Sequence, residues 1–129
     1  MSTLQKLPAA LFVDFDQHRS AHPPATAKYM LLEVQMDGEK RIILRTAPTK
    51  LNHRNILEVF GYEADDHTLP RLTVQQLGGG YLASDENSKR MIIGGQSRNF
   101  GPANHVQAQE LLQAALPDYT ITIDNNLIV

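Results

Sequence analysis

The stretch KYMLLEVQMDGEKRIILRT, residues 28–46, decides much of the fold. Residues 28–36 and 40–46 alternate in polarity and are rich in aliphatic and β-branched side chains, which is the pattern of strands. The dipeptide Asp37-Gly38 between them is typical of a tight hairpin turn. The sequence therefore predicts two neighbouring antiparallel strands.

The same alternation recurs in five shorter segments. They span residues 11–15, 71–77, 80–84, 90–94 and 119–123. The segment 17–27 lacks this pattern and contains Pro23 and Pro24, so we expect a loop or linker there.

Two further segments carry apolar residues at helical spacing. Residues 52–64 have an i, i+3, i+4 stripe, and Gly61 marks its expected end. Residues 102–116 have an i, i+3, i+4, i+7 stripe that opens with Pro102 and stops before Pro117. The sum predicts an α+β domain: a mixed, largely antiparallel sheet of about six strands, flanked by two helices.

Length and composition narrow the functional classes. A chain of 129 residues predicts one domain with a real core. The absence of cysteine excludes disulfides, thiolate zinc sites and phosphatases that work through a cysteinyl-phosphate. A net charge of −2 with scattered basic residues argues against nucleic-acid binding. With no long apolar run and no signal-peptide pattern, we expect a cytoplasmic protein without membrane contact, and its size suggests a monomer.

Glycines cluster in the segments LGGGY, residues 77–81, and GGQSRNFGPANH, residues 94–105. Three consecutive glycines in a strand imply a bulge or a close backbone approach. Backbone N–H groups of Ser97, Arg98 and Asn99, just before a glycine and a helix start, form a natural cradle for an anion. These segments predict a small anion-binding site.

His53 is the candidate base of such a site. Asn52 is a good N-cap, which places His53 in the first helical turn. The positive end of the helix dipole disfavours the imidazolium form, so the ring should be neutral and able to accept a proton. The alternative interpretation is a surface histidine near a helix start.

Three other candidates have equally simple structural interpretations. His105 extends the apolar stripe of the second helix, so it is either a half-buried packing residue or part of the site. Lys28 and Arg45 lie at strand ends and could neutralise an oxyanion, although solvated cations are common there.

A metal-dependent alternative begins at LFVDFDQH, residues 11–18. Asp14 and Asp16 resemble the DxD of magnesium-dependent aspartyl phosphatases, but acids on the outer side of an edge strand produce the same pattern. His18 and His22 have metal-ligand spacing, yet they lie beside Pro23 and Pro24 in a polar segment without a third ligand nearby, which favours a solvated loop.

Several motifs occur together in a specific order. They are AKYMLLEV at 27–34, the RIILR…NH segment, LGGG at 77–80, GGQSRNFGPANH, and PDYTI at 117–121. Together they resemble the 14-kDa phosphohistidine phosphatase family, also called the Janus/Ocnus family, over residues 26 to 124.

This resemblance implies a hydrolase without cofactor or metal that removes phosphate from histidine in proteins, with lysine as a further substrate left open. It implies that His53 is catalytic, as general base or as nucleophile. It also implies a set of phosphate-binding or supporting residues: Lys28, Arg45, Ser97, Arg98, Asn99 and His105. The expected partners are proteins that contain phosphohistidine.

The sequence departs from the family pattern in three places. Tyr81 follows the glycines where an arginine is expected, Asn52 replaces an aromatic residue, and the segment 17–27 is longer than expected. A second hypothesis is therefore a non-catalytic module that binds phosphate or phosphoproteins on the same fold.

Overall fold

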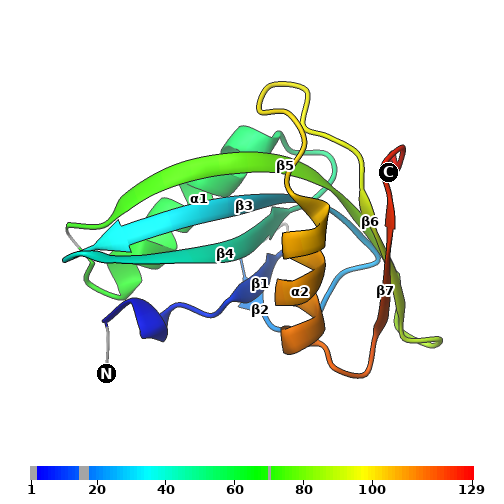
Figure 1. Ribbon diagram of the computed structural model, residues 1–129, viewed down its shortest axis with the longest axis horizontal. Coiled ribbons are helices and arrows are strands. Elements are labelled where there is room, and N and C mark those ends of the chain that lie inside the picture. Colours follow the sequence, from blue (N-terminus) through cyan, green and yellow to red (C-terminus); the bar gives the residue numbers. More distant parts are fainter. Residues whose placement is uncertain (1–2, 15–17, 70) are drawn as a thin grey trace.

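A computed structural model of the protein describes residues 3–14, 18–69 and 71–129. Seven strands form one open sheet in the order β2-β1-β4-β3-β5-β6-β7 (Figure 1). The strands are β1 (Ala10–Val13), β2 (Arg19–Ser20), β3 (Thr26–Met36), β4 (Glu39–Ala47), β5 (Thr73–Asp85), β6 (Arg90–Gly94) and β7 (Thr120–Asp124). The helices are the 3-10 turn η1 (Thr3–Lys6), α1 (His53–Asp66) and α2 (His105–Ala115).

The sheet is mixed and mostly antiparallel, which confirms the predicted α+β class. Parallel pairing occurs only between β1 and β4 and between β6 and β7 among the described strands. The predicted hairpin joins β3 and β4, with Met36 opposite Glu39. Asp37 and Gly38 both have positive φ angles, 52° and 83°, as a two-residue hairpin turn requires.

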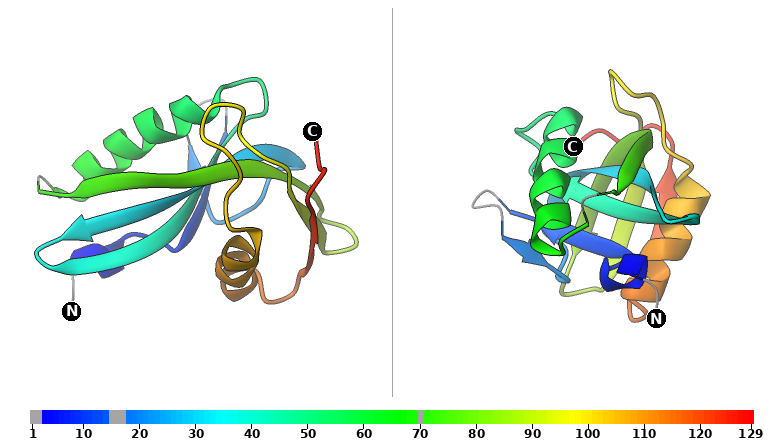
Figure 2. Two further views of the ribbon diagram at one scale, coloured as in Figure 1. Left: turned by 45° about the horizontal axis from the view of Figure 1, so that its top comes forward. Right: turned by 90° about the vertical axis from the view of Figure 1, so that its left-hand side faces the viewer.

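The two helices cover opposite faces of the sheet (Figures 1 and 2). Because β3 is central, it buries both of its faces. Met30 and Leu32 belong to a cluster with Ile56 and Phe60 of α1. The intervening residues of β3 belong to a second cluster.

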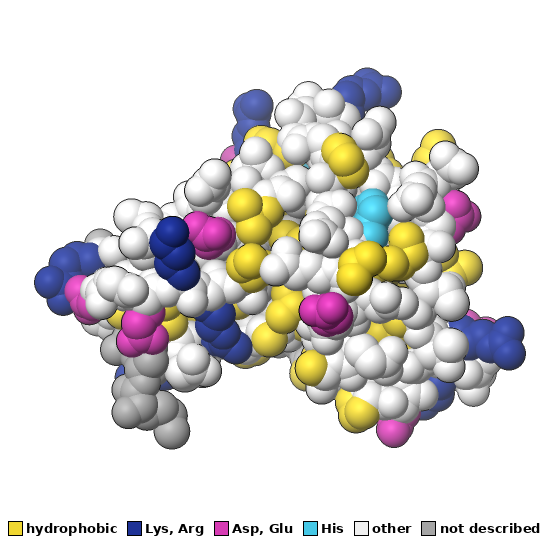
Figure 3. Space-filling model, in the orientation of Figure 1, with side chains coloured by type: hydrophobic (Ala, Val, Ile, Leu, Met, Phe, Trp, Pro, Cys, Tyr) yellow, Lys and Arg dark blue, Asp and Glu magenta, His cyan; other side chains and the backbone are white. Residues whose placement is uncertain are grey.

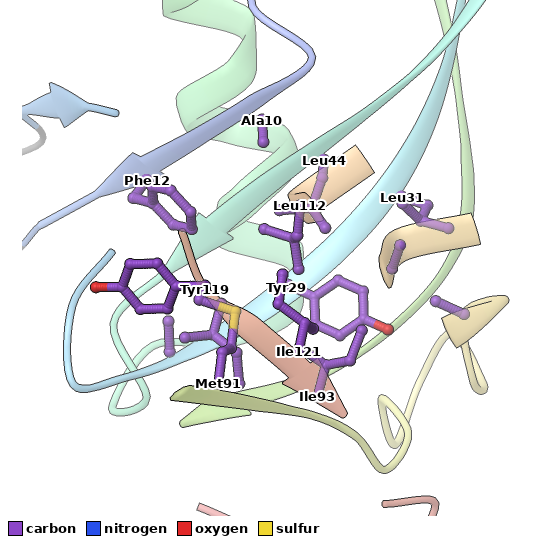
Figure 4. Close-up of a cluster of buried hydrophobic side chains, with 14 residues drawn as sticks. Ala10, Phe12, Tyr29, Leu31, Leu44, Met91, Ile93, Leu112, Tyr119 and Ile121 are labelled. Atoms are coloured by element: carbon purple, nitrogen blue, oxygen red, sulfur yellow. The ribbon is translucent and has the colours of Figure 1, made fainter. Parts of the chain in front are cut away.

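Tyr29 and Leu31 pack in this second cluster with Leu112 of α2 and Ile121 of β7 (Figure 4). The continuous apolar run of β3 is thus explained by helices on both sides. Among the described residues, no helix is long and apolar enough to cross a membrane.

Several element boundaries differ from the sequence prediction. The predicted segments 71–77 and 80–84 merge into one strand, β5, which begins at Thr73. The glycines between them continue the pairing with β3 after a register shift opposite Leu31. The predicted bulge at the glycines is therefore confirmed. The segment 17–27 contains β2 and the first residues of β3, so it is not a loop throughout.

The helix boundaries also differ. Helix α1 continues through Gly61 to Asp66, where helical hydrogen bonding tolerates a glycine at modest cost. Helix α2 begins at His105 and not at Pro102, because the Asn104 side chain caps it by accepting a hydrogen bond from Gln107 N at 3.1 Å. Pro102 pairs instead with Gly79 in an isolated parallel bridge.

Candidate functional site

A pocket of about 240 Å³ lies where β3, the start of α1, β5 and the loop after β6 meet. It is lined by Lys28, Asn52, His53, Tyr81, Ser97, Arg98 and Asn99. We call it the His53 pocket. Five of the seven predicted site residues are brought together here, although they come from segments up to 71 positions apart.

His53 is the first residue of α1, and Asn52 is its N-cap as predicted. The Asn52 N–H donates to Asn55 Oδ1 at 2.9 Å, which fixes the first turn. His53 itself is only 7% exposed. The helix start thus holds a nearly buried imidazole against the sheet.

Hydrogen bonding defines the tautomer of His53. Its Nε2 lies 2.9 Å from the carbonyl oxygen of Gly80. A carbonyl can only accept, so Nε2 carries the proton and Nδ1 carries the lone pair. Nδ1 makes no hydrogen bond with any residue that the structure describes. The ring therefore has one nitrogen ready to accept a proton.

The pKa of His53 is lowered from its ordinary value. Burial is the main cause, the Gly80 carbonyl acts in the opposite direction, and the positive charge of Lys28 lowers the pKa further. The sequence predicted a neutral ring from the helix dipole, whereas in the folded protein desolvation is the main reason. The outcome is the same: an uncharged base.

Lys28 is held close to the start of α1. Its Nζ donates to the carbonyl oxygen of Leu51 at 2.6 Å, and its backbone pairs with Tyr81 across β3 and β5. The Tyr81 ring lies edge-on to the His53 ring, with centroids 5.7 Å apart and planes at 69°. The sequence identified Tyr81 only as a departure from the family pattern, and its role as a wall of the pocket was not predicted.

The loop after β6 is fixed by its own backbone. The Ser97 N–H donates to Gly79 O at 3.2 Å and to Gly101 O at 3.3 Å. It is therefore not free to bind an anion, contrary to the prediction from the sequence. The Ser97 side-chain oxygen accepts from Phe100 N at 3.2 Å, which leaves its hydroxyl proton as a donor. The N–H groups of Arg98 and Asn99 make no hydrogen bond with any described residue.

The consecutive glycines let this loop and His53 approach the sheet. A Cβ at Gly79 would lie 2.6 Å from Cδ2 of His53, and one at Gly80 would lie 2.6 Å from the carbonyl oxygen of Gly94. At Gly78, where φ is 99°, a Cβ would lie 2.3 Å from Pro102 O. The predicted close backbone approach is thus confirmed.

Arg45 lies outside the His53 pocket and is only 1% exposed. Its guanidinium forms two hydrogen bonds to the carboxylate of Glu63 in α1, at 2.8 and 2.7 Å, and a third to Leu44 O at 2.8 Å. Sequence reasoning missed Glu63. Its position three residues after Phe60 on the apolar stripe of α1 was the available signal.

His105 also lies outside the pocket. Its Nδ1 contacts the hydroxyl of Tyr29, and its Nε2 lies 2.7 Å from the carbonyl oxygen of Gly95. His105 is thus half-buried, hydrogen-bonded on both ring nitrogens, and not among the residues that line the His53 pocket. Burial raises the pKa of Tyr29, which keeps its hydroxyl protonated.

Asp14, the aspartate of residues 11–18 that the structure describes, does not line the His53 pocket. Asp14 is exposed and accepts from the His18 N–H at 2.9 Å, while Asp16 lies outside the described residues. His22 lies 3.2 Å from Glu86. Across residues 3–14, 18–69 and 71–129, no group of three or more His, Cys, Asp or Glu side chains could hold a metal ion.

Comparison with known proteins identifies relatives of this chain. The model of the Janus/Ocnus family matches residues 18–120. Sex-regulated protein janus-B of Drosophila erecta is 31% identical over 103 residues, which cover 76% of this chain and 71% of the relative. Sex-regulated protein janus-A of Drosophila melanogaster is 26% identical over 106 residues, covering 80% and 75%. The chain therefore belongs to the Janus/Ocnus family.

Proposed function

We propose that this protein is a metal-independent phosphohistidine phosphatase that hydrolyses the P–N bond of phosphorylated histidine in proteins. The observation that carries the proposal is the neutral imidazole of His53, whose Nδ1 is free of described partners, in a pocket with two cations. The resemblance of the sequence motifs to phosphohistidine phosphatases supports it.

The pocket suits a phosphoryl group in its charge and its hydrogen-bond donors. Lys28 and Arg98 supply positive charge, and no carboxylate lines the pocket among the described residues. The N–H groups of Arg98 and Asn99 and the Ser97 hydroxyl supply donors for oxygen atoms. A fixed set of donors stabilises the charge that develops on a transferring phosphoryl group. Arg98 provides a cation although the sequence has Tyr81 where the family pattern has arginine.

Two routes use the same geometry. In the first, His53 Nδ1 takes a proton from water as the water oxygen bonds to phosphorus and the P–N bond breaks. The leaving nitrogen takes up a proton from solvent, and the His53 imidazolium then releases its proton to solvent. In the second, Nδ1 attacks phosphorus as the P–N bond of the substrate breaks, and the leaving nitrogen takes up a proton from solvent. Water then hydrolyses the phosphorylated His53, which releases phosphate and restores the free ring. The P–N bond to imidazole is labile, so positioning and charge stabilisation are the main demands on the enzyme.

The test is hydrolysis of a histidine-phosphorylated peptide in excess chelator, with wild type compared with His53→Ala. We expect turnover by wild type and none by the variant, while the variant still binds the phosphopeptide in a calorimetric titration. A rapid acid-free quench that traps phosphate on His53 would select the nucleophilic route.

Two other results would contradict the proposal. Binding without turnover by wild type would identify a phosphate-binding module instead. Activity that chelator abolishes would point to metal-dependent chemistry.

A further inference from the structure

A second hollow, of about 580 Å³, adjoins the His53 pocket. The two share Tyr81 and Arg98 as a common wall. The rest of the second hollow is formed by the loop after β6 and the segment after β7, through Gly95, Gln96, Asn125, Asn126, Leu127 and Ile128. We call this hollow the C-terminal groove.

The floor of the C-terminal groove is preformed. Gly95 has a φ of 71°, and a Cβ there would lie 2.2 Å from the carbonyl oxygen of Leu127 and 2.8 Å from Cδ2 of Tyr81. The Leu127 N–H donates to Asp124 O at 3.0 Å, which closes the turn after β7. Because backbone contacts fix this floor, a ligand would meet a shaped surface without first ordering it.

The side chains around the groove suit a polypeptide main chain. Gln96, Asn125 and Asn126 are exposed, and their side-chain amides make no hydrogen bond with any described residue. Each amide offers both a donor and an acceptor, as a peptide group does. Ile128 adds an apolar surface that is 83% exposed.

The charge of the groove limits which kinds of ligand it can bind favourably. Arg98 is its charged residue, and no carboxylate lines it among the described residues. A third hollow of about 520 Å³ shares Gly95, Gln96 and Asn125 with the groove and reaches Val106 at the start of α2. Val106 is 57% exposed there, and Figure 3 shows hydrophobic side chains beside a histidine on the face of the molecule that is drawn in Figure 1. The groove and the third hollow thus form a continuous surface through their shared residues, and the positive charge of Arg98 favours neutral or acidic residues over basic ones.

We propose that the C-terminal groove binds the polypeptide segment next to the phosphorylated residue of the substrate. This inference rests on the proposed function of the His53 pocket. The polypeptide that bears the phosphoryl group extends beyond that pocket, and the shared wall of Tyr81 and Arg98 places the C-terminal groove directly beside it. Gln96 and Asn125 would then determine the preference for polypeptide over small substrates.

The experiment measures how the full chain hydrolyses two substrates. One is a histidine-phosphorylated polypeptide, and the other is the phosphoramidate ion, which has a P–N bond but no polypeptide. The test variant is Gln96→Ala with Asn125→Ala. The matched control is Gln75→Ala with Asn87→Ala, an exposed strand glutamine and an exposed turn asparagine that line neither the groove nor the His53 pocket. Circular dichroism and thermal unfolding check that both variants fold.

We expect the test variant to raise KM for the phosphopolypeptide roughly five- to tenfold, with kcat and phosphoramidate hydrolysis unchanged. The control should behave as wild type on both substrates. An unchanged KM for the polypeptide, or an equal loss on both substrates, would overturn the groove proposal while leaving the proposed function intact. A wild type inactive on both substrates would overturn the proposed function, and this inference with it.

Discussion

The Nε2–H of His53 points at the carbonyl oxygen of Gly80, 2.9 Å away, so a residue of α1 is oriented by a residue of β5 that lies 27 positions later. This contact assigns the ring proton to Nε2 and leaves Nδ1 as the acceptor. It also requires the glycines of β5, since a side chain at Gly79 would collide with the same ring.

The first prediction concerns the pH dependence of activity. A base must be neutral to act, and burial with Lys28 lowers the pKa of His53. The acid limb of kcat/KM should therefore have its midpoint below about 6.5, the ordinary histidine value. The measurement is a pH–rate profile on the phosphoramidate ion, corrected for the separately titrated ionisation of the substrate. A midpoint at or above the ordinary value would rule out His53 as the titrating base.

The second prediction links the same pKa to stability. Because the pKa of His53 is lower in the folded state, the unfolded chain binds more protons between that pKa and about 6.5. The free energy of unfolding should thus rise with pH across this window and fall as the solution is acidified. Urea titrations of wild type and His53→Gln, whose amide can still donate to Gly80 O, should show this slope only in the wild type.

Lys28 should affect both the binding of the phosphoramidate ion and the pKa of His53. Lys28→Gln removes a positive charge from the His53 pocket, so KM for the phosphoramidate ion should rise roughly tenfold or more. The same change removes a cause of the lowered pKa, so the acid limb of the pH–rate profile should move upward. A rise in KM without any movement of the acid limb would show that Lys28 does not act on His53.

A methyl group at Gly79 should lower both the stability and the activity of the protein. Its Cβ would lie 2.6 Å from His53 Cδ2 and 2.8 Å from the carbonyl oxygen of Tyr29, and the latter belongs to a central strand that cannot easily move. Gly79→Ala should lower the free energy of unfolding by about 1–3 kcal/mol and reduce activity by displacing His53. The matched control is Gly61→Ala in α1, where a Cβ meets nothing within 4 Å. It should stabilise the protein by about 0.5–1 kcal/mol.

Arg45 should prove structural. Arg45→Met leaves Glu63 buried without its partner and should cost about 3–5 kcal/mol of stability, most of which Arg45→Met with Glu63→Leu should recover. Below its unfolding temperature the double variant should keep the wild-type KM for the phosphoramidate ion. If the double variant recovers its stability but has a raised KM, Arg45 takes part in phosphate binding.

Local sequence signals located the elements of the site but not their arrangement. Several features depend only on residues that lie within a few positions of each other in the sequence. They are the hairpin at Asp37-Gly38, the apolar stripes of both helices and the N-cap at Asn52. Such short-range patterns depend on backbone preferences and periodicity, which the sequence shows directly. The start of α2 was predicted three residues early because Pro102 suits a helix start, whereas Asn104 provides the actual cap.

The sequence by itself determined every described strand except β2, the two helices and the presence of a histidine at a helix start beside a glycine-rich loop. Only the tertiary structure decided that Lys28, Tyr81 and Arg98 line one pocket with His53. It also decided that Arg45 forms a buried ion pair with Glu63 outside that pocket. The physical reason is that these contacts depend on strand order, register and burial. Each is set by the packing of segments tens of residues apart, and no local preference encodes it.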